Sequence, residues 1–416
     1  MKFPPVPPQI VYFIFFIGFF IAFLFIFLIL RKKEKINYEE IKEDVSFLIP
    51  AKNAQETIRK CIYSVINQDY SGKINIVVVN DGSTDNTEKI VREISKEIKN
   101  KKNRKIFLLC RESQGRKAFA VNYGLKFIFE KIKTPYIAIL DADSFIHKNA
   151  LKDMLPRLKE KTMCVISPIS VYNRNNLLTK LQLIEYTMSY FFRELLGKID
   201  SLCIAPAFSL FRTEFFLKYG IYDTNAITED FEIALRIKAK GYKIAMSNFK
   251  VYTIVPEKLG SLRKQRIRWG YGEIYNFFKY KHLLFSGKHG MFGIFFMPII
   301  FGLGLILIML GFFIMVYLII SSLNNLIHYI SIGWIPNLDL KINLFSLSLF
   351  FADLKIILII ISIIISSFFF IYAYKYRKEK INFLHFLIYM FVYSFFLAYL
   401  RFEGILRYIL KIKTEW

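Results

Sequence analysis

Four long runs of apolar residues restrict where much of this 416-residue chain can lie. Asp, Glu, Lys and Arg are all absent from Val11–Leu30, Met291–Leu323, Ile356–Tyr374 and Phe383–Leu400. An α-helix of about 20 apolar residues crosses the ~30 Å hydrocarbon core of a bilayer. The alternative, helices buried in a protein core, fits poorly with uncharged runs of this length. The first three runs are therefore predicted to span a membrane.

Charges beside these runs predict the orientation of the chain. The cluster "RKKEK" (31–35) follows the first run directly, with no small-residue cleavage site between them. This pattern indicates an uncleaved anchor whose C-terminal end is cytosolic, so residues 36–288 are expected in the cytosol. The fourth run has eighteen residues, contains His385 and precedes Arg401 and Arg407. We expect it to lie in the membrane plane or to re-enter, giving a multi-pass cell-membrane protein with three spans and a cytosolic C-terminus.

The composition also limits the partners of the chain. Its formal net charge is +25, but the lysines are scattered and no DNA-binding motif accompanies them, so nucleic acid is not expected as a partner. Anionic membrane lipids and a phosphate-bearing substrate account better for this charge. The four cysteines are isolated among apolar residues and are predicted to be reduced core residues.

The segment after the first run alternates two kinds of pattern. Helical periodicity covers 56–68, 86–99 and 117–132, and short apolar stretches separate these ranges. The apolar stretches, typical of strands covered on both faces, are "VSFLI" (45–49), "INIVVV" (74–79), "KIFLLC" (105–110) and "YIAIL" (136–140). The alternation predicts an α/β fold with a mostly parallel, Rossmann-like sheet. Ligands of such sheets bind beyond the carboxyl ends of the strands.

Polar and acidic residues follow these strands where a ligand is expected. "NDGSTDNT" (80–87) follows the second strand, and Asp141 and Asp143 follow the fourth. At positions i and i+2 the two carboxylates point the same way, so their charges repel unless a cation lies between them. Oxygen ligands suit Mg²⁺ or Mn²⁺, which take one or two carboxylates plus substrate phosphates. Taken singly, each motif also fits a turn or a helix cap. The lack of a G-x-G-x-x-G turn counts against a dinucleotide cofactor.

Together these motifs resemble those of family 2 glycosyltransferases, which have the GT-A fold. The resemblance covers residues 44 to about 275 and includes "LIPAKN", "VVVNDGSTDNT", "GRKAFAVNYG", "ILDADS", "FSLFR", "ITEDFEIALRIKAKGYKI" and "VPEKLGSLRKQRIRWGYG". The T-E-D and Q-x-x-R-W patterns are similar to those of the membrane-bound branch with poly-N-acetylglucosamine, hyaluronan, chitin-oligosaccharide and cellulose synthases. The implied division is an N-terminal anchor (1–35), a cytosolic GT-A domain (36–260), an interfacial segment (261–290) and a C-terminal membrane region (291–416).

The resemblance implies a role for each residue on the donor side. Pro50, Asn53 and Asp81 would line the uridine pocket, with Asp81 bonding the base or the ribose. Lys117 would approach the diphosphate, and Asp141 would contact the nucleotide.

The remaining implied roles concern catalysis and the acceptor. Asp143 would ligate the metal ion, and Asp230 would be the general base that takes the proton of the acceptor hydroxyl. Gln265, Arg268 and Trp269 would close the site. Arg268 would form charge-assisted bonds to phosphate, and Trp269 would offer an apolar plate to the acceptor sugar.

The chemistry calls for these residue types on its own account. Charge that develops on the leaving diphosphate needs a cation, and the attacking hydroxyl needs a positioned base. All five histidines lie outside the motifs, which leaves a carboxylate as the base. Glu229 and Asp230 are adjacent and diverge if helical, so only one can face the acceptor. Taken singly, they also fit the first turn of a helix capped by Thr228, and Arg268–Trp269 fits interfacial anchoring.

The expected function is inverting, metal-dependent transfer from a UDP-sugar, such as UDP-GlcNAc or UDP-Glc, to a growing polysaccharide at the membrane. Three spans enclose little room for a polymer, so a second copy or a translocation subunit is expected to help it cross. One alternative is transfer of a single sugar to a lipid acceptor, and another is an inactive membrane scaffold. Ala54 and Pro206 stand where the family often has Glu and Gly, respectively, and both departures leave the acceptor open.

Overall fold

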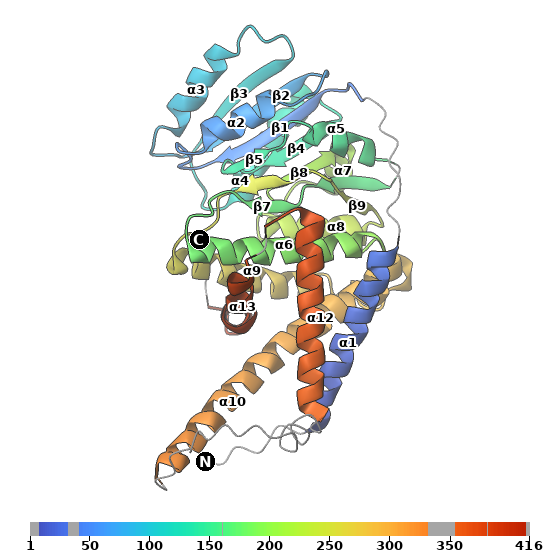
Figure 1. Cartoon of the computed structure of the whole chain (residues 1–416). Helices are drawn as coiled ribbons and strands as arrows, with labels where there is room; N and C mark the ends of the chain where they lie inside the picture. The colour runs from blue at the N-terminus through green and yellow to red at the C-terminus, as the bar shows by residue number, and fades with distance from the viewer. Residues whose placement is uncertain (1–7, 32–40, 160, 332–353, 381, 413–416) are drawn as a thin grey trace. The chain divides into compact units, whose positions relative to one another are not determined.

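The chain forms two compact units in a computed structural model (Figure 1). The structure describes residues 8–31, 41–159, 161–331, 354–380 and 382–412. The larger unit, here called the catalytic unit, comprises Lys32–Phe301 and Leu384–Trp416. The smaller unit comprises Met1–Arg31 and Gly302–Phe383.

A seven-stranded sheet forms the centre of the catalytic unit, in the order β3-β2-β1-β4-β8-β6-β9. Its strands are β1 (Val45–Ala51), β2 (Ile74–Asp81), β3 (Arg104–Arg111), β4 (Tyr136–Leu140), β6 (Thr162–Ile166), β8 (Phe208–Arg212) and β9 (Lys243–Met246). Neighbouring strands from β3 to β4 are parallel, as are β6 and β9, whereas β8 runs antiparallel to both β4 and β6. The prediction of a mostly parallel sheet is confirmed.

Helices cover both faces of this sheet. The α-helices of the unit are α2 (Ile58–Ile66), α3 (Thr87–Glu97), α4 (Lys117–Phe127), α5 (Ala150–Met154), α6 (Leu177–Gly197), α7 (Thr213–Tyr219), α8 (Glu229–Ala239), α9 (Leu259–Lys279), α13 (Phe383–Ile388) and α14 (Ser394–Ile409). Successive β1 residues face opposite sides: Phe47 joins the core formed with α2 and α3, and Leu48 meets α4. A Cβ added to Gly124 of α4 would lie 2.2 Å from Leu48 Cδ1, so only glycine allows this approach.

A smaller sheet adjoins the carboxyl end of β4. It has the order β5-β10-β7, formed by β5 (Ser144–Ile146), β10 (Val251–Thr253) and β7 (Ile169–Val171). Strand β5 begins directly after the turn that contains Asp141 and Asp143, and its antiparallel pairing with β10 places Thr253 opposite Ser144. The small sheet thereby fixes the backbone that follows the two carboxylates.

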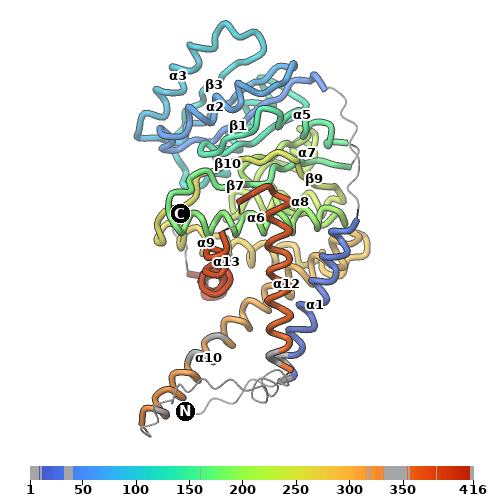
Figure 2. The backbone as a smooth tube through the Cα atoms, in the orientation of Figure 1, coloured from blue at the N-terminus to red at the C-terminus, as the bar shows by residue number. Residues whose placement is uncertain are grey.

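The C-terminal segment (residues 384–412) packs against α9 within the catalytic unit (Figure 2). The α9 and α14 backbones approach closely, because a Cβ on Gly270 would lie 2.7 Å from the Arg401 carbonyl oxygen and one on Gly404 would lie 2.5 Å from that of Ile267. Arg401 also forms a two-bond ion pair with Glu273 of α9, at 2.5 and 2.7 Å. Small residues at a helix crossing and a paired charge together indicate a specific interface.

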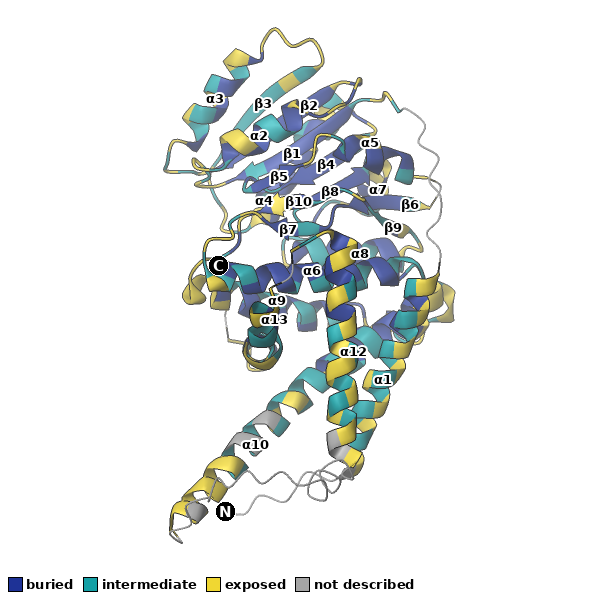
Figure 3. Cartoon of the chain, viewed as in Figure 1, coloured by how far each residue is buried: buried dark blue, intermediate teal, exposed yellow. Residues whose placement is uncertain are grey.

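The smaller unit contains α1 (Pro8–Leu30), α10 (Gly304–Ser331) and α12 (Leu354–Arg377). Phe25 of α1 meets Phe369 of α12 edge to face, with ring centroids 6.5 Å apart. Many other apolar side chains of these helices are exposed, in contrast to the buried sheet (Figure 3). By length and composition, the described helices that could cross a membrane are Tyr12–Leu30, Phe292–Ile314, Ile357–Arg377 and Phe383–Ile409.

The cysteines are free thiols, and the prediction that all four are core residues fails for one of them. Cys61, Cys164 and Cys203 are buried, whereas Cys110 is exposed. Cys110 lies on β3, which is the edge strand of the large sheet and therefore has a less covered surface.

Candidate active site

The carboxyl end of β4 carries the first acidic motif. The Asp141 amide donates to the Ala207 carbonyl at 2.9 Å, and the Ser144 amide donates to the Asp141 carbonyl at 3.0 Å. These bonds hold the turn from both sides and direct Asp141 and Asp143 beyond the strand. Pro50 lies at the same edge, near the end of the neighbouring strand β1.

Asp143 is held by hydroxyl groups of the small sheet. Ser144 Oγ and Thr253 Oγ1 donate to Asp143 Oδ1, at 3.2 and 3.3 Å. Burial and the charge of Asp141 raise the pKa of Asp143 to about 6. Within the described ranges no three His, Cys, Asp or Glu side chains gather around one point to hold a metal ion. Two neighbouring carboxylates are ligands that a divalent cation accepts together with the phosphates of a substrate.

Lys117 links the two acidic motifs. It lies at the start of α4, and its ammonium group contacts Asp141 Oδ1 and lies 3.8 Å from Glu229 Oε1. Lys117 keeps 38% of its side chain exposed, but the surrounding protein desolvates the amine and opposes its charge. The carboxylates of Asp141 and Glu229 outweigh this effect and raise the pKa of the amine above its ordinary value. The predicted approach of Lys117 to a diphosphate remains untested, but in this structure its ammonium group pairs with Asp141.

The T-E-D residues form the start of α8. Burial raises the pKa of Glu229 against the charge of Lys117. Burial likewise raises the pKa of Asp230, against the charges of Lys117 and Arg268. Asp230 Oδ1 accepts a hydrogen bond from the Phe231 amide at 2.9 Å. Two acids that favour a proton, next to two basic groups, form a site suited to proton transfer.

One face of α9 contacts the turn before α8. Arg268, Gly272 and Asn276 lie four residues apart along this face. Arg268 Nη1 donates to the Ile227 carbonyl at 3.5 Å, and Asn276 Nδ2 donates to Thr228 Oγ1 at 3.0 Å. A Cβ on Gly272 would lie 2.3 Å from Thr228 Oγ1. Thr228 is the N-cap residue as predicted, but its side chain makes no cap hydrogen bond and binds α9 instead.

Sequence reasoning missed Gly272 and Asn276. Their spacing from Arg268 was visible in the sequence as two further helical turns, but nothing local indicated which segment this face contacts.

Gln265 and Trp269 lie on either side of a buried arginine. Arg266 Nη1 donates to Gln265 Oε1, and its guanidinium carbon lies 4.1 Å from the centroid of the Trp269 ring. Arg266 Nη2 in turn pairs with Glu185 Oε2 of α6 at 2.8 Å. Gln265 and Trp269, two residues predicted to close the site, are thus joined to the protein interior through one side chain.

Two residues predicted to line the uridine pocket, Asn53 and Asp81, are held by contacts with neighbouring loops and strands. Asn53 has a positive φ of 50°, and its Oδ1 accepts from the Thr84 amide at 2.9 Å, joining the loops after β1 and β2. Asp81 is only 5% exposed. Arg111 Nε lies 3.0 Å from Asp81 Oδ1, and Ser113 Oγ donates to Oδ2 at 3.0 Å. Asp81 Oδ2 therefore accepts a hydrogen bond, whereas Oδ1 has the ion-pair contact with Arg111 but no hydrogen-bond partner among the described residues.

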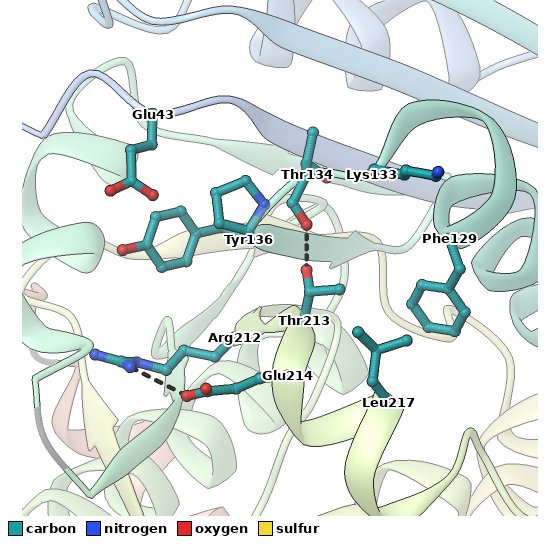
Figure 4. Close-up of a pocket in the computed structure, with 10 residues that line it drawn as sticks. Glu43, Phe129, Lys133, Thr134, Tyr136, Arg212, Thr213, Glu214 and Leu217 are labelled. Carbon is teal, nitrogen blue, oxygen red and sulfur yellow. Dashed lines mark hydrogen bonds and ion pairs between the residues drawn. The ribbon is translucent and has the colours of Figure 1, made fainter.

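A separate pocket lies at the opposite edge of the sheet (Figure 4). It measures about 600 Å³, at the start of β4 and the end of β8. There Arg212 Nη1 pairs with Glu214 at 3.1 Å, and Thr213 Oγ1 donates to the Thr134 carbonyl at 2.6 Å. The pocket lining contains no residue of the acidic or Q-x-x-R-W motifs, so it is not part of the candidate active site.

A mostly parallel sheet that presents acidic side chains beyond the carboxyl ends of its strands is the arrangement of the GT-A class of glycosyltransferases. Comparison with known families agrees with this class. The chain belongs to glycosyltransferase family 2: the model of glycosyl transferase family 2 matches residues 46–220, and that of glycosyl transferase family group 2 matches residues 136–400.

Curated relatives include poly-β-1,6-N-acetyl-D-glucosamine synthases. That of Staphylococcus aureus (strain COL) is 32% identical over 250 residues, 58% of this chain and 57% of the relative. That of Staphylococcus epidermidis is 32% identical over 237 residues, 55% of this chain and 54% of the relative. The chain thus matches little more than half the length of these relatives.

A mannosyltransferase from Pyrobaculum calidifontis, solved in complex with GDP-Man and Mn²⁺, superposes with a TM-score of 0.62 at 15% identity. The match covers 96% of both chains, and it shows a shared fold.

Proposed function

We propose that this protein transfers N-acetylglucosamine from UDP-GlcNAc to the hydroxyl of a growing polysaccharide, with inversion, at the cytosolic face of the cell membrane. The observation that carries the proposal is the position of Lys117, which contacts Asp141 and lies 3.8 Å from Glu229. This contact brings the donor and acceptor motifs to one place. The names of the curated relatives support the choice of sugar and of a polymer product.

On the donor side, Asp141 and Asp143 are the proposed ligands of Mg²⁺ or Mn²⁺. When bound, the ion would neutralise the charge that develops on the leaving diphosphate. Lys117 contributes a second positive charge, because its side chain is 38% exposed and can donate a hydrogen bond to a phosphate oxygen. Arg268 is the third cation of the site. Pro50, Asn53 and Asp81 are the proposed contacts of the nucleoside, with Asp81 bonding the base or the ribose.

On the acceptor side, Asp230 is the proposed general base. It takes the proton of the acceptor hydroxyl while that oxygen forms a bond to the anomeric carbon of the donor sugar. The bond from this carbon to the diphosphate oxygen breaks with its electron pair, and UDP leaves. A single displacement of this kind inverts the anomeric centre. Glu229, which lies beside Lys117, and Gln265 and Trp269 of α9 are the proposed contacts of the sugars.

The experiment uses the purified full chain in lipid nanodiscs with a panel of UDP-sugars and Mg²⁺ or Mn²⁺. Mass analysis of the products should show a ladder of N-acetylhexosamine units only with UDP-GlcNAc. A single sugar added to lipid would favour the lipid-acceptor alternative, and no transfer from any donor would refute the proposal. Full activity in excess EDTA would refute the proposal that transfer requires a metal ion.

A further inference from the structure

A buried ion pair lies behind the Q-x-x-R-W face of α9. Arg266 is only 5% exposed, and its charge is balanced by Glu185 of α6 at 2.8 Å. The same guanidinium bonds Gln265 and faces the ring of Trp269. Its Nε atom has no hydrogen-bond partner in the part of the chain that the structure describes. The orientation of Arg266 therefore depends on few contacts, and Glu185 is the charged one.

The C-terminal segment touches this ion pair. Tyr393 is 3% exposed, and its hydroxyl donates to Glu185 Oε2 at 3.1 Å. Arg266 Nη2 donates to the same oxygen. One carboxylate oxygen thus joins α6, α9 and the C-terminal segment. Because a hydrogen bond to a buried charge is strong and directional, the hydroxyl helps to fix the carboxylate that in turn fixes Arg266.

We propose that Tyr393, Glu185 and Arg266 form a positioning relay through which the C-terminal segment orients Gln265 and Trp269 toward the acceptor. The inference rests on the proposed function, in which these two residues face the acceptor sugar. None of the three relay residues is a catalytic residue, since they act on the acceptor through Gln265 and Trp269.

The relay is separable from the packing of the C-terminal segment. The α9–α14 interface is already held by the close approach at Gly270 and Gly404 and by the Arg401–Glu273 pair. Loss of one hydroxyl at Tyr393 therefore leaves the segment docked. The donor side is held by other groups, the hydroxyls of Ser144 and Thr253, so the relay should affect the acceptor and leave the donor unchanged.

The kinetic test compares Tyr393→Phe with Tyr408→Phe. Tyr408 lies on the same segment and packs on Tyr271 and Tyr275 of α9, but its hydroxyl makes no hydrogen bond within the described residues. Tyr393→Phe should raise the KM for an oligosaccharide acceptor about tenfold, as expected from losing one hydrogen bond to a charged group. The Kd for UDP-GlcNAc should stay constant, and Tyr408→Phe should leave both values unchanged.

A second readout needs no transferase activity. In a background with Trp334→Phe and Trp416→Phe, Trp269 is the remaining tryptophan. Tyr393→Phe should change the acrylamide quenching of Trp269 at unchanged melting temperature. Glu185→Gln should change the quenching too, but it should also lower the melting temperature, because it leaves the buried charge of Arg266 without its partner. The two changes combined should be less than additive, because both act through one carboxylate. An unchanged acceptor KM with unchanged Trp269 quenching would overturn the relay. Altered quenching in a protein that transfers no sugar would refute the proposed function and leave the relay standing.

Discussion

The ionised form of Asp143 is disfavoured in the metal-free protein, and the proposed metal ion would offset this cost. Burial and the charge of Asp141 raise its pKa to about 6, so ionising Asp143 destabilises the metal-free protein as the pH rises through that value. Asp143→Asn removes a proposed ligand of the metal ion, so it should abolish transfer and weaken the binding of the metal–nucleotide complex. In EDTA at pH 7.5, the unfolding free energy of the Asp143→Asn variant should equal that of the unchanged protein or exceed it by on the order of 1 kcal/mol. Scanning fluorimetry checks this, and a clear loss of stability would show that the Asp143 charge is structural.

Asp230 gives a prediction for the pH dependence of the rate. A general base acts in its ionised form, and burial raises the pKa of Asp230. The rate should therefore fall as the pH drops through a value above the ordinary ~3.9 of an aspartate. Asp230→Asn should lower turnover by roughly 10² to 10⁴ and remove this limb, with UDP-GlcNAc binding retained. Loss of donor affinity with turnover intact would instead make Asp230 a binding residue.

Single residues also show where sequence reasoning stops. The i, i+2 spacing of Asp141 and Asp143 was enough to expect a cation beside them, because charge repulsion follows from local geometry. The contact of Lys117 with Asp141 could not be derived, since Lys117 lies 24 residues away and reaches the carboxylate through the fold. The engagement of Asp81 by Arg111 is likewise a tertiary contact between two neighbouring strands.

At the scale of elements, α9 connects the Q-x-x-R-W motif to the T-E-D turn through a glycine contact. Gly272→Ala would place a Cβ 2.3 Å from Thr228 Oγ1, so the helix must shift away from the turn. We expect turnover to fall roughly 10²-fold, the effect of misplacing a catalytic group by about 1 Å. The melting temperature should also fall, but by less than it would if α9 unfolded.

The control for this change is Gly260→Ala on the same helix. A Cβ there meets no heavy atom within 4 Å, so activity should be retained and stability unchanged or slightly higher. Equal activity of the two variants would show that the approach of α9 to Thr228 does not position the site.

The elements themselves were predictable where their pattern is local. The four apolar stretches became β1 to β4 and the three periodic ranges became α2, α3 and α4, within a few residues. Antiparallel β8 was not foreseen as such, because "FSLFR" carries no signal of strand direction. The contact between α9 and α14 was also missed, since the glycines that allow it lie more than 130 positions apart.

On the scale of the whole molecule, the C-terminal segment combines two properties. It is apolar enough to cross a membrane, yet it belongs to the same compact unit as the sheet and pairs its Arg401 with Glu273 of α9. Glu403 of the same segment pairs with Arg263 of α9 at 2.5 Å. Charged contacts on one face and apolar residues on the other are typical of a helix lying at a membrane surface.

This arrangement supports the prediction of three spans and a cytosolic C-terminus. A full crossing by Phe383–Leu400 would carry Arg401, Arg407, Lys411 and Lys413 to the outer face, against the positive-inside rule. It would also draw Arg401 away from Glu273. A cysteine placed after Lys413 should therefore react poorly with a membrane-impermeant maleimide in intact cells and fully after permeabilisation. Cys110→Ser in the background removes the exposed native thiol. Efficient labelling from outside would mean four spans and would require the α9–α14 interface to be absent in the membrane.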